Sequence, residues 1–201
     1  CPVSAVSFAV RKYGCAMGVM ITASHNPAEY NGYKVYGSQG AQITDAQARQ
    51  ILKRIDNIDI FADVSWLNFE SAKKTEYFDF AGDELMSEYI DAAMAYALPW
   101  TEDELAAAKA LGALSVVYSP LNGAGRMPVQ EVLRRLGVGR IETVKVQEFP
   151  DENFSTCPYP NPEKEEAMCE ALKLAGKVKP DIVIVTDPDC DRVGVAVAKN
   201  G

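Results

Sequence analysis

The chain has 201 residues, 48% of them apolar and 24% charged, a composition that is typical of a folded globular protein and argues against disorder. Its 28 acidic and 20 basic residues leave a net charge of −8, whereas a nucleic-acid-binding protein needs a basic surface. No run approaches the roughly 18 consecutive apolar residues of a membrane span. We therefore expect neither a nucleic-acid partner nor a membrane partner.

The cysteines and the chain ends carry two further expectations. The five cysteines form no CxxC pair and there is one histidine, which predicts free thiols in a cytoplasmic protein rather than a structural zinc site. The chain begins with Cys1 rather than Met and stops just after the apolar run 193–198. Both ends look cut, so we expect a piece of a longer protein.

Along the first part of the chain, short apolar runs predict strands over 18–22 and 33–36. Thr44 is predicted to cap a helix, because its side chain and that of Gln47 can form a capping box. The spacing of the apolar residues that follow predicts one buried helix face: Ala48, Ile51, Leu52 and Ile55. No element is predicted with clarity over 57–82.

The rest of the chain alternates helical and strand-like segments, which is the pattern of a βαβαβ unit with a parallel sheet. One helix is expected to begin after an Asn161 cap and to end at Gly176, with Met168, Ala171, Leu172 and Ala175 on its buried face. The other segments are predicted as helices over 83–98, 102–111 and 126–136 and strands over 114–118, 141–146 and 181–185.

The fold class is therefore α/β. We expect two α/β domains of three layers, with mixed or mostly parallel sheets, over residues 1–82 and 83–201. Both domains are expected to be partial.

An acidic loop, TDPDCDR (186–192), follows the last predicted strand. Alternate side chains of an extended segment point the same way, so Asp187, Asp189 and Asp191 would repel each other strongly unless a cation lay among them. Oxygen ligands with no nearby His or Cys favour Mg²⁺, with Mn²⁺ or Ca²⁺ also suitable. The alternative is a solvated turn or a set of helix caps. The loop is not an EF-hand, because the Gly and the distant Glu that an EF-hand requires are absent.

A second loop, TASHNP (22–27), also follows a predicted strand, where ligands of α/β sheets gather. Ser24 there can be a nucleophile, a helix cap or a turn residue. A serine hydrolase is disfavoured, because GxSxG is absent and His25 is adjacent to Ser24. An activated serine beside a metal suits phosphoryl transfer, with Lys34 as the nearest proton carrier or, alternatively, a solvated surface lysine.

Four segments together resemble one known family. They are GVMITASHNPAEYNGYKVYGSQGAQIT (18–44), SPLNGAGRMPVQEVL (119–133), PYPNPEKEEAM (158–168) and TDPDCDRVGVAV (186–197). Their type and order resemble the α-D-phosphohexomutases, and the phosphoglucomutase-like branch best. Many relatives have Gly where this chain has Pro188 and Cys190, a departure that removes no ligand.

The resemblance implies a metal site and a reaction. Ser24 would carry phosphate, and the phosphoserine oxygen with Asp187, Asp189 and Asp191 would hold one Mg²⁺. The enzyme would move phosphate between the C1 and C6 hydroxyls of a hexose, with a hexose 1,6-bisphosphate as intermediate and activator. If this is correct, the Ser24 hydroxyl lies within roughly 8 Å of the acidic cluster.

The resemblance also implies roles for other residues. Lys34 would act in proton transfer, and His25 would act with Ser24 and Lys34 in catalysis. His25, Lys34, Asp191 and Arg192 would contact phosphate or sugar. A small sugar phosphate, glucose phosphate in the first place and mannose or pentose phosphate as alternatives, would be the substrate.

Length sets this chain apart from the family, whose members have four domains. The chain resembles the end of the first domain and most of the second, so the loops that choose the sugar and grip the second phosphate would belong to the remaining domains of a parent chain. We expect the fragment alone to be unable to run the full cycle. Two other classes stay open: a Mg²⁺-dependent phosphatase with an Asp nucleophile, and a non-catalytic module that binds metal or sugar phosphate.

Overall fold

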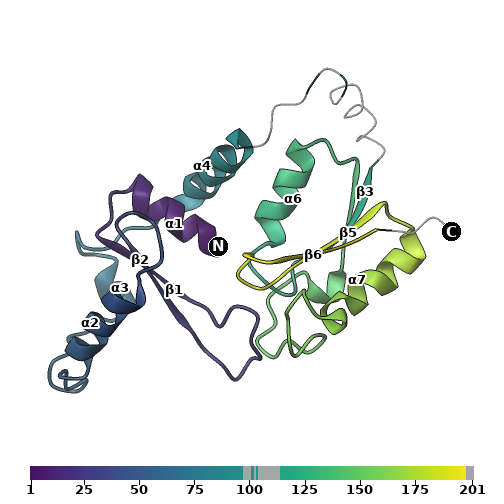
Figure 1. Cartoon of the computed structure of the whole chain (residues 1–201). Helices are drawn as coiled ribbons and strands as arrows, with labels where there is room; N and C mark the ends of the chain where they lie inside the picture. The colour runs from purple at the N-terminus through teal and green to yellow at the C-terminus, as the bar shows by residue number, and fades with distance from the viewer. Residues whose placement is uncertain (97–100, 102, 104–113, 198–201) are drawn as a thin grey trace.

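A computed structural model of the chain describes residues 1–96, 101, 103 and 114–197. The described chain forms two parts of mixed helix and strand, which confirms the α/β class (Figure 1). The helix predicted over 102–111 lies outside the described residues except for residue 103. No helix that the structure describes is both long and apolar enough to cross a membrane. All five cysteines are free thiols.

The first part is a two-stranded antiparallel sheet with helices around it. Its core is small and consists of Val3, Val10 and Tyr36, with partly buried neighbours packed on them. The sequence pattern did not reveal the first helix, whose N-cap, Pro2, makes no side-chain capping bond. The elements are α1 (Val3–Lys12), β1 (Met17–Ile21), β2 (Tyr33–Gly37), α2 (Asp45–Ile55), α3 (Phe69–Ala72) and α4 (Gly82–Ala95).

Helix α2 begins as predicted but packs differently. The capping box of Thr44 and Gln47 is present, because it joins groups only three residues apart. The predicted buried face was wrong: no residue of α2 is buried, and Leu52 and Ile55 are 54% and 51% exposed. The other two residues of this face, Ala48 and Ile51, are half-buried.

The second part is a four-stranded sheet in the order β4-β3-β5-β6. Strand β3 pairs in parallel with β4 and β5, so the predicted parallel βαβαβ unit is confirmed, but β6 runs antiparallel at the edge and makes the sheet mixed. The elements are β3 (Ser115–Ser119), α6 (Arg126–Arg135), β4 (Arg140–Thr143), the 3₁₀ turn η1 (Lys145–Gln147), α7 (Glu165–Val178), β5 (Ile182–Thr186) and β6 (Val193–Val197).

Helices cover both faces of this sheet. On one face, Ala167, Met168 and Ala171 of α7 pack against valines of β3 and β5. On the other face, Leu133 of α6 packs against Val116 and Tyr118 of β3. The result is the expected three-layer arrangement, with β3 buried along its whole length.

Several predicted boundaries were wrong. Helix α7 begins after Lys164 rather than Asn161, whose side chain instead accepts the amide of Glu163. It continues through Gly176 and ends where Lys179 takes a left-handed conformation. Leu172 is 46% exposed. The strand predicted over 141–146 ends at Thr143 because the chain turns into η1, and the helix predicted over 83–98 ends at Ala95.

Helix α4 joins the two parts. It begins next to the boundary that the sequence predicts at residues 82 and 83, and it contacts both α1 and α6 (Figure 1). The amide of Val3, in the first turn of α1, also donates to the carbonyl of Asp189 in the second part, at 2.9 Å. These contacts bring the end of β1 close to the end of β5. The domain boundary itself stays a prediction.

Candidate active site between two loops

The acidic loop leaves the carboxyl end of β5, a strand whose last two residues are buried. Asp187 and Asp189 are buried, at 0% and 2% exposure, while Asp191 is exposed. Each of the three offers a carboxylate oxygen, and these oxygens lie within 4.8 Å of one another. Burial of two carboxylates contradicts the alternative of a simple solvated turn.

Backbone contacts hold the acidic loop in this shape. One oxygen of Asp187, Oδ1, accepts the amides of Asp191 and Arg192 at 3.0 and 2.9 Å. Cys190 has φ 61°, a left-handed conformation, so the acidic loop is a turn rather than the extended segment that the sequence suggested. Ala124 donates its amide to the Pro188 carbonyl at 2.7 Å. A side chain at Gly123 would overlap the backbone of Pro188, so this close approach requires glycine.

The serine loop leaves the end of β1 and is held at its base. Ser24 is itself left-handed, with φ 54°. Its amide donates to Oγ1 of Thr22 at 2.8 Å, a turn in which a threonine side chain replaces a backbone acceptor. The Thr22 amide donates to the Gly32 carbonyl at 3.1 Å and closes the loop. Strained backbone of this kind, at about 1–3 kcal/mol per residue, is often found at functional sites.

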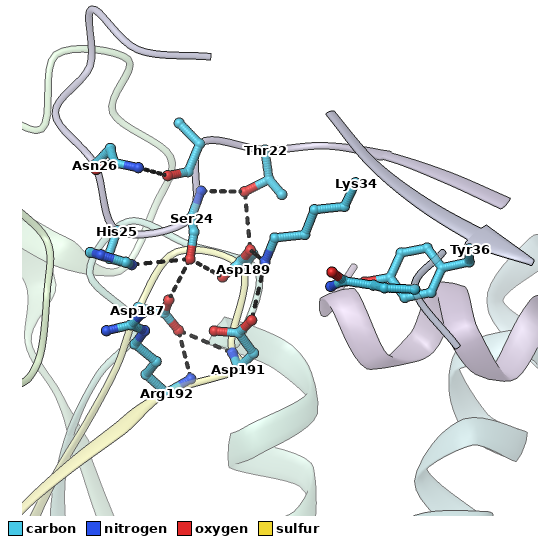
Figure 2. Close-up of polar contacts among 12 residues, drawn as sticks. Thr22, Ser24, His25, Asn26, Lys34, Tyr36, Asp187, Asp189, Asp191 and Arg192 are labelled. Atoms are coloured by element: carbon cyan, nitrogen blue, oxygen red, sulfur yellow. Dashed lines mark hydrogen bonds and ion pairs between the residues drawn. The ribbon is translucent and has the colours of Figure 1, made fainter. Parts of the chain in front are cut away.

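The two loops meet at the Ser24 hydroxyl (Figure 2). Oγ of Ser24 lies 3.3 Å from both Oδ2 of Asp187 and Oδ1 of Asp189, so its one hydroxyl hydrogen can be donated to either carboxylate, and it lies 3.2 Å from Nδ1 of His25. The hydroxyl is therefore well inside the roughly 8 Å expected from the sequence. One cation could contact the serine oxygen and the carboxylates together.

Lys34 reaches the same cluster from β2. Its ammonium donates to Asp189 at 2.8 Å and to Asp191 at 3.1 Å, and its side chain is 21% exposed. Ser24 and Lys34 thus occupy the two oxygens of one carboxylate, that of Asp189. The alternative of a solvated surface lysine is contradicted by these contacts.

The cluster has strongly perturbed acidity. Burial raises the pKa of Asp187 to about 7, and the adjacent carboxylates of Asp189 and Asp191 add to the rise. Burial acts in the same direction on Asp189, but the Lys34 hydrogen bond and charge outweigh it and hold the pKa of Asp189 below its usual value. Burial lowers the pKa of Lys34, but the hydrogen bonds and negative charges of Asp189 and Asp191 outweigh this effect, so the pKa is raised above its usual value.

The remaining predicted residues lie at the border of the cluster. His25 contacts Ser24, whereas the guanidinium of Arg192 pairs with Glu163 at 2.9 Å. Sequence reasoning missed Thr22, which donates to Asp189 at 3.2 Å in addition to accepting from Ser24. The position of Thr22, two residues before Ser24, fits a side-chain turn and could have revealed it. Sequence reasoning also missed Glu163, because its ion-pair partner, Arg192, is far away in the sequence.

Two models of known protein families match the chain. The model of phosphoglucomutase/phosphomannomutase alpha/beta/alpha domain II matches residues 87–201, and that of alpha/beta/alpha domain I matches residues 1–60. The chain belongs to the phosphoglucomutase/phosphomannomutase family.

Individual relatives agree with the family assignment. Phosphoglucomutases of two Staphylococcus aureus strains, bovine RF122 / ET3-1 and USA300, are 38% identical over 195 residues, which is 95% of this chain and 33% of theirs. The chain thus spans about a third of the length of the curated relatives it matches.

Solved structures of the family share the fold. One from Thermus thermophilus that carries the phosphomannomutase name has a TM-score of 0.71 at 25% identity, over 98% of this chain and 40% of that one. Parafusin, a phosphoglucomutase from Paramecium, has a TM-score of 0.65 at 18% identity, and the match covers 98% of this chain and 38% of the parafusin chain. At this identity the likeness supports the fold alone.

The residues of this family member are a suitable donor set for a hard divalent cation. All four available donors, three carboxylates and one hydroxyl, are oxygens. Two of the carboxylates are buried, and the single positive charge of Lys34 does not balance the negative charge of all three. The arrangement can therefore hold a metal beside a group attached to Ser24.

Proposed function

We propose that the protein to which this chain belongs is an intramolecular phosphotransferase that interconverts hexose 1-phosphate and hexose 6-phosphate. It would work through a phosphorylated Ser24 and a bisphosphorylated sugar. The observation that carries this proposal is the meeting of Ser24 Oγ with Asp187 and Asp189 at 3.3 Å, across more than 160 residues of sequence. The names of the relatives, phosphoglucomutase and phosphomannomutase, support the same reaction class.

In this proposal, Asp187, Asp189 and Asp191 hold one Mg²⁺ together with an oxygen of the group on Ser24. When bound, the ion would neutralise phosphate charge and polarise the phosphorus. The hydrogen bonds of Asp187 to backbone amides keep one of its oxygens occupied, so its other oxygen, which faces Ser24, remains for the ion. The left-handed turn at Ser24 presents the hydroxyl to these carboxylates.

The transfer exchanges one ester for another. The bond between phosphorus and Ser24 Oγ breaks as a bond between phosphorus and a sugar hydroxyl oxygen forms, and the proton of that hydroxyl ends on Ser24 Oγ. Lys34 would give a proton to Ser24 Oγ and regain one from the sugar hydroxyl, because its ammonium shares the Asp189 carboxylate with Ser24 and its raised pKa keeps it protonated between turnovers. The reverse transfer then returns phosphate from the bisphosphate to Ser24.

His25 and Arg192 would contact phosphate or sugar at the edge of the cluster. His25 already lies 3.2 Å from Ser24 Oγ, and Arg192 is one residue beyond the last metal ligand. Asp191, the exposed carboxylate, would also face the sugar. Glucose phosphate is the proposed substrate, with mannose and pentose phosphates as the alternatives that assays on a parent protein would separate. Since the chain spans about a third of its relatives, the 201-residue chain alone is expected to stop before a full cycle.

Intact-mass measurement tests the phosphoserine. The full-length protein that contains this chain is incubated with a hexose 1,6-bisphosphate and Mg²⁺, and one added phosphate is expected on the unaltered protein and on Ser65→Ala, which removes an exposed serine. Ser24→Ala should stay unmodified. Phosphate trapped on an aspartate would instead identify a phosphatase-like enzyme, and no phosphate from any sugar-phosphate donor would favour a binding module.

A further inference from the structure

A proline-rich segment of the second part, residues 157–163, reaches back to the serine loop. Its backbone is firmly anchored: Cys157 and Asn161 are 3% and 4% exposed, and Pro160 is fully buried. The carbonyl of Tyr159 accepts both the Asn161 amide at 2.8 Å and the Cys157 thiol at 3.3 Å. Tyr159 therefore has a fixed backbone, yet its side chain is 40% exposed.

The ring of Tyr159 packs against the ring of His25. The ring centroids are 6.2 Å apart and the planes meet at 80°, an edge-to-face arrangement that aromatic pairs prefer. His25 is the imidazole whose Nδ1 lies 3.2 Å from Ser24 Oγ. The two rings come from different parts of the chain, so the contact forms only when the serine loop lies against the second part.

The same segment also contacts the acidic loop. Glu163, at its end, pairs with the guanidinium of Arg192 at 2.9 Å. The amide of Arg192 in turn donates to Asp187, one of the carboxylates at Ser24. Residues 157–163 thus touch both side chains that border the cluster, His25 through Tyr159 and Arg192 through Glu163.

We propose that Tyr159 is a positioning residue that holds the His25 imidazole in the rotamer in which Nδ1 faces Ser24 Oγ. An imidazole at a loop tip can adopt several rotamers, and each unfrozen torsion lowers the fraction of time spent in the productive one. A ring fixed by a buried backbone removes this freedom. The role in catalysis rests on the proposed function, in which His25 contacts the phosphate on Ser24.

The experiment uses the single histidine of the chain, whose ring signals in NMR are unambiguous. At one fixed pH, we expect nuclear Overhauser contacts between the rings of His25 and Tyr159, and three-bond couplings of His25 that report one χ1 rotamer. Tyr159→Phe should retain the single rotamer and the ring-current shift, because the ring remains. Tyr159→Ala should lose the shift and show averaged couplings. Tyr77→Ala, which removes a tyrosine that is 89% exposed, is the matched control.

Two results would overturn the inference: no contact between the two rings in the unaltered chain, or a single His25 rotamer that persists in Tyr159→Ala. The first readout needs no variant, so it decides the question even if Tyr159→Ala does not fold. Neither readout requires phosphate on Ser24. Failure here is therefore distinguishable from failure of the phosphoserine proposal, which the mass measurement reports.

Discussion

The two parts of the chain contrast in how well they bury their apolar residues. In the second part, β3 lies between two parallel strands with helices on both faces, and all five of its residues are buried. In the first part, β1 has one strand partner, and Met17, Val19 and Ile21 are 41–58% exposed. Burial of apolar surface contributes about 25 cal/mol per Å², so the second part has the larger share of the stabilising free energy.

The candidate site combines one loop from each of these parts. The acidic loop extends from the well-packed sheet, and the serine loop extends from the weakly packed ribbon. The precise distance between Ser24 and the carboxylates therefore depends on the contacts that join the parts, from α4, from Val3 and from Tyr159.

Amide hydrogen exchange should separate the two parts most clearly. We expect the amides of β3 to exchange at least about a thousandfold more slowly than those of α2, because β3 opens only when the sheet unfolds while α2 is uncovered. Exchange read by NMR on the same sample gives both rates. Equal protection of β3 and α2 would mean that the parts unfold as one unit, contrary to the contrast drawn from burial.

A pair of leucine truncations measures the same contrast in stability. Leu133 is 9% exposed and Leu52 is 54% exposed, so the two side chains differ mainly in burial. Leu133→Ala should lower the free energy of unfolding by about 2–4 kcal/mol, and Leu52→Ala by less than about 0.5 kcal/mol. Urea unfolding gives both values. A comparable loss for both variants would show that α2 has a packing partner.

Metal affinity should depend on pH through Asp187. Its pKa in the folded chain is about 7, above the 3.8 of an unperturbed Asp, so the folded state holds a proton that a cation must displace below pH 7. We expect Mg²⁺ or Mn²⁺ affinity to fall about tenfold for each pH unit below 7 and to level off above it. Calorimetric titration measures this, and Asp187→Asn should bind weakly with a flat pH profile.

The same pKa sets the sign of a stability effect in the metal-free chain. Because the folded state binds the Asp187 proton more tightly than the unfolded state, the stability that this group contributes decreases as pH rises from about 4 to about 7. In Asp187→Asn this decrease should be absent, since the amide can still accept the two backbone amides. Thermal unfolding of both chains at pH 5 and pH 8 compares the slopes.

The smallest expected effect concerns Lys34, which competes with a cation for two carboxylates. Its ammonium lies 2.8 Å from Asp189 and 3.1 Å from Asp191. At pH 8, Lys34→Met should raise metal affinity by about 3- to 10-fold, because the cation no longer displaces a positive charge. Lys12→Met is the matched control, since Lys12 pairs with Glu88 away from the cluster. An unchanged affinity in Lys34→Met would show that the lysine moves aside freely.

Features that depend on residues close together in the chain were predictable from the sequence. The capping box of α2 joins residues three apart, and the parallel βαβαβ unit follows from apolar runs alternating with helices. These features were predictable because local backbone geometry carries them. The resemblance of the two loops to a family also named the residues that the structure brings together.

Features that depend on residues far apart in the chain became visible only in the folded structure. The meeting of Ser24 with Asp187 joins residues 163 positions apart, and no local pattern carries that distance. The antiparallel edge strand β6, the exposure of Leu52 and the packing of Tyr159 on His25 likewise depend on which surfaces happen to be covered. Side-chain periodicity shows that a face is apolar, whereas burial requires a partner, and partners are chosen by the packing of the whole chain.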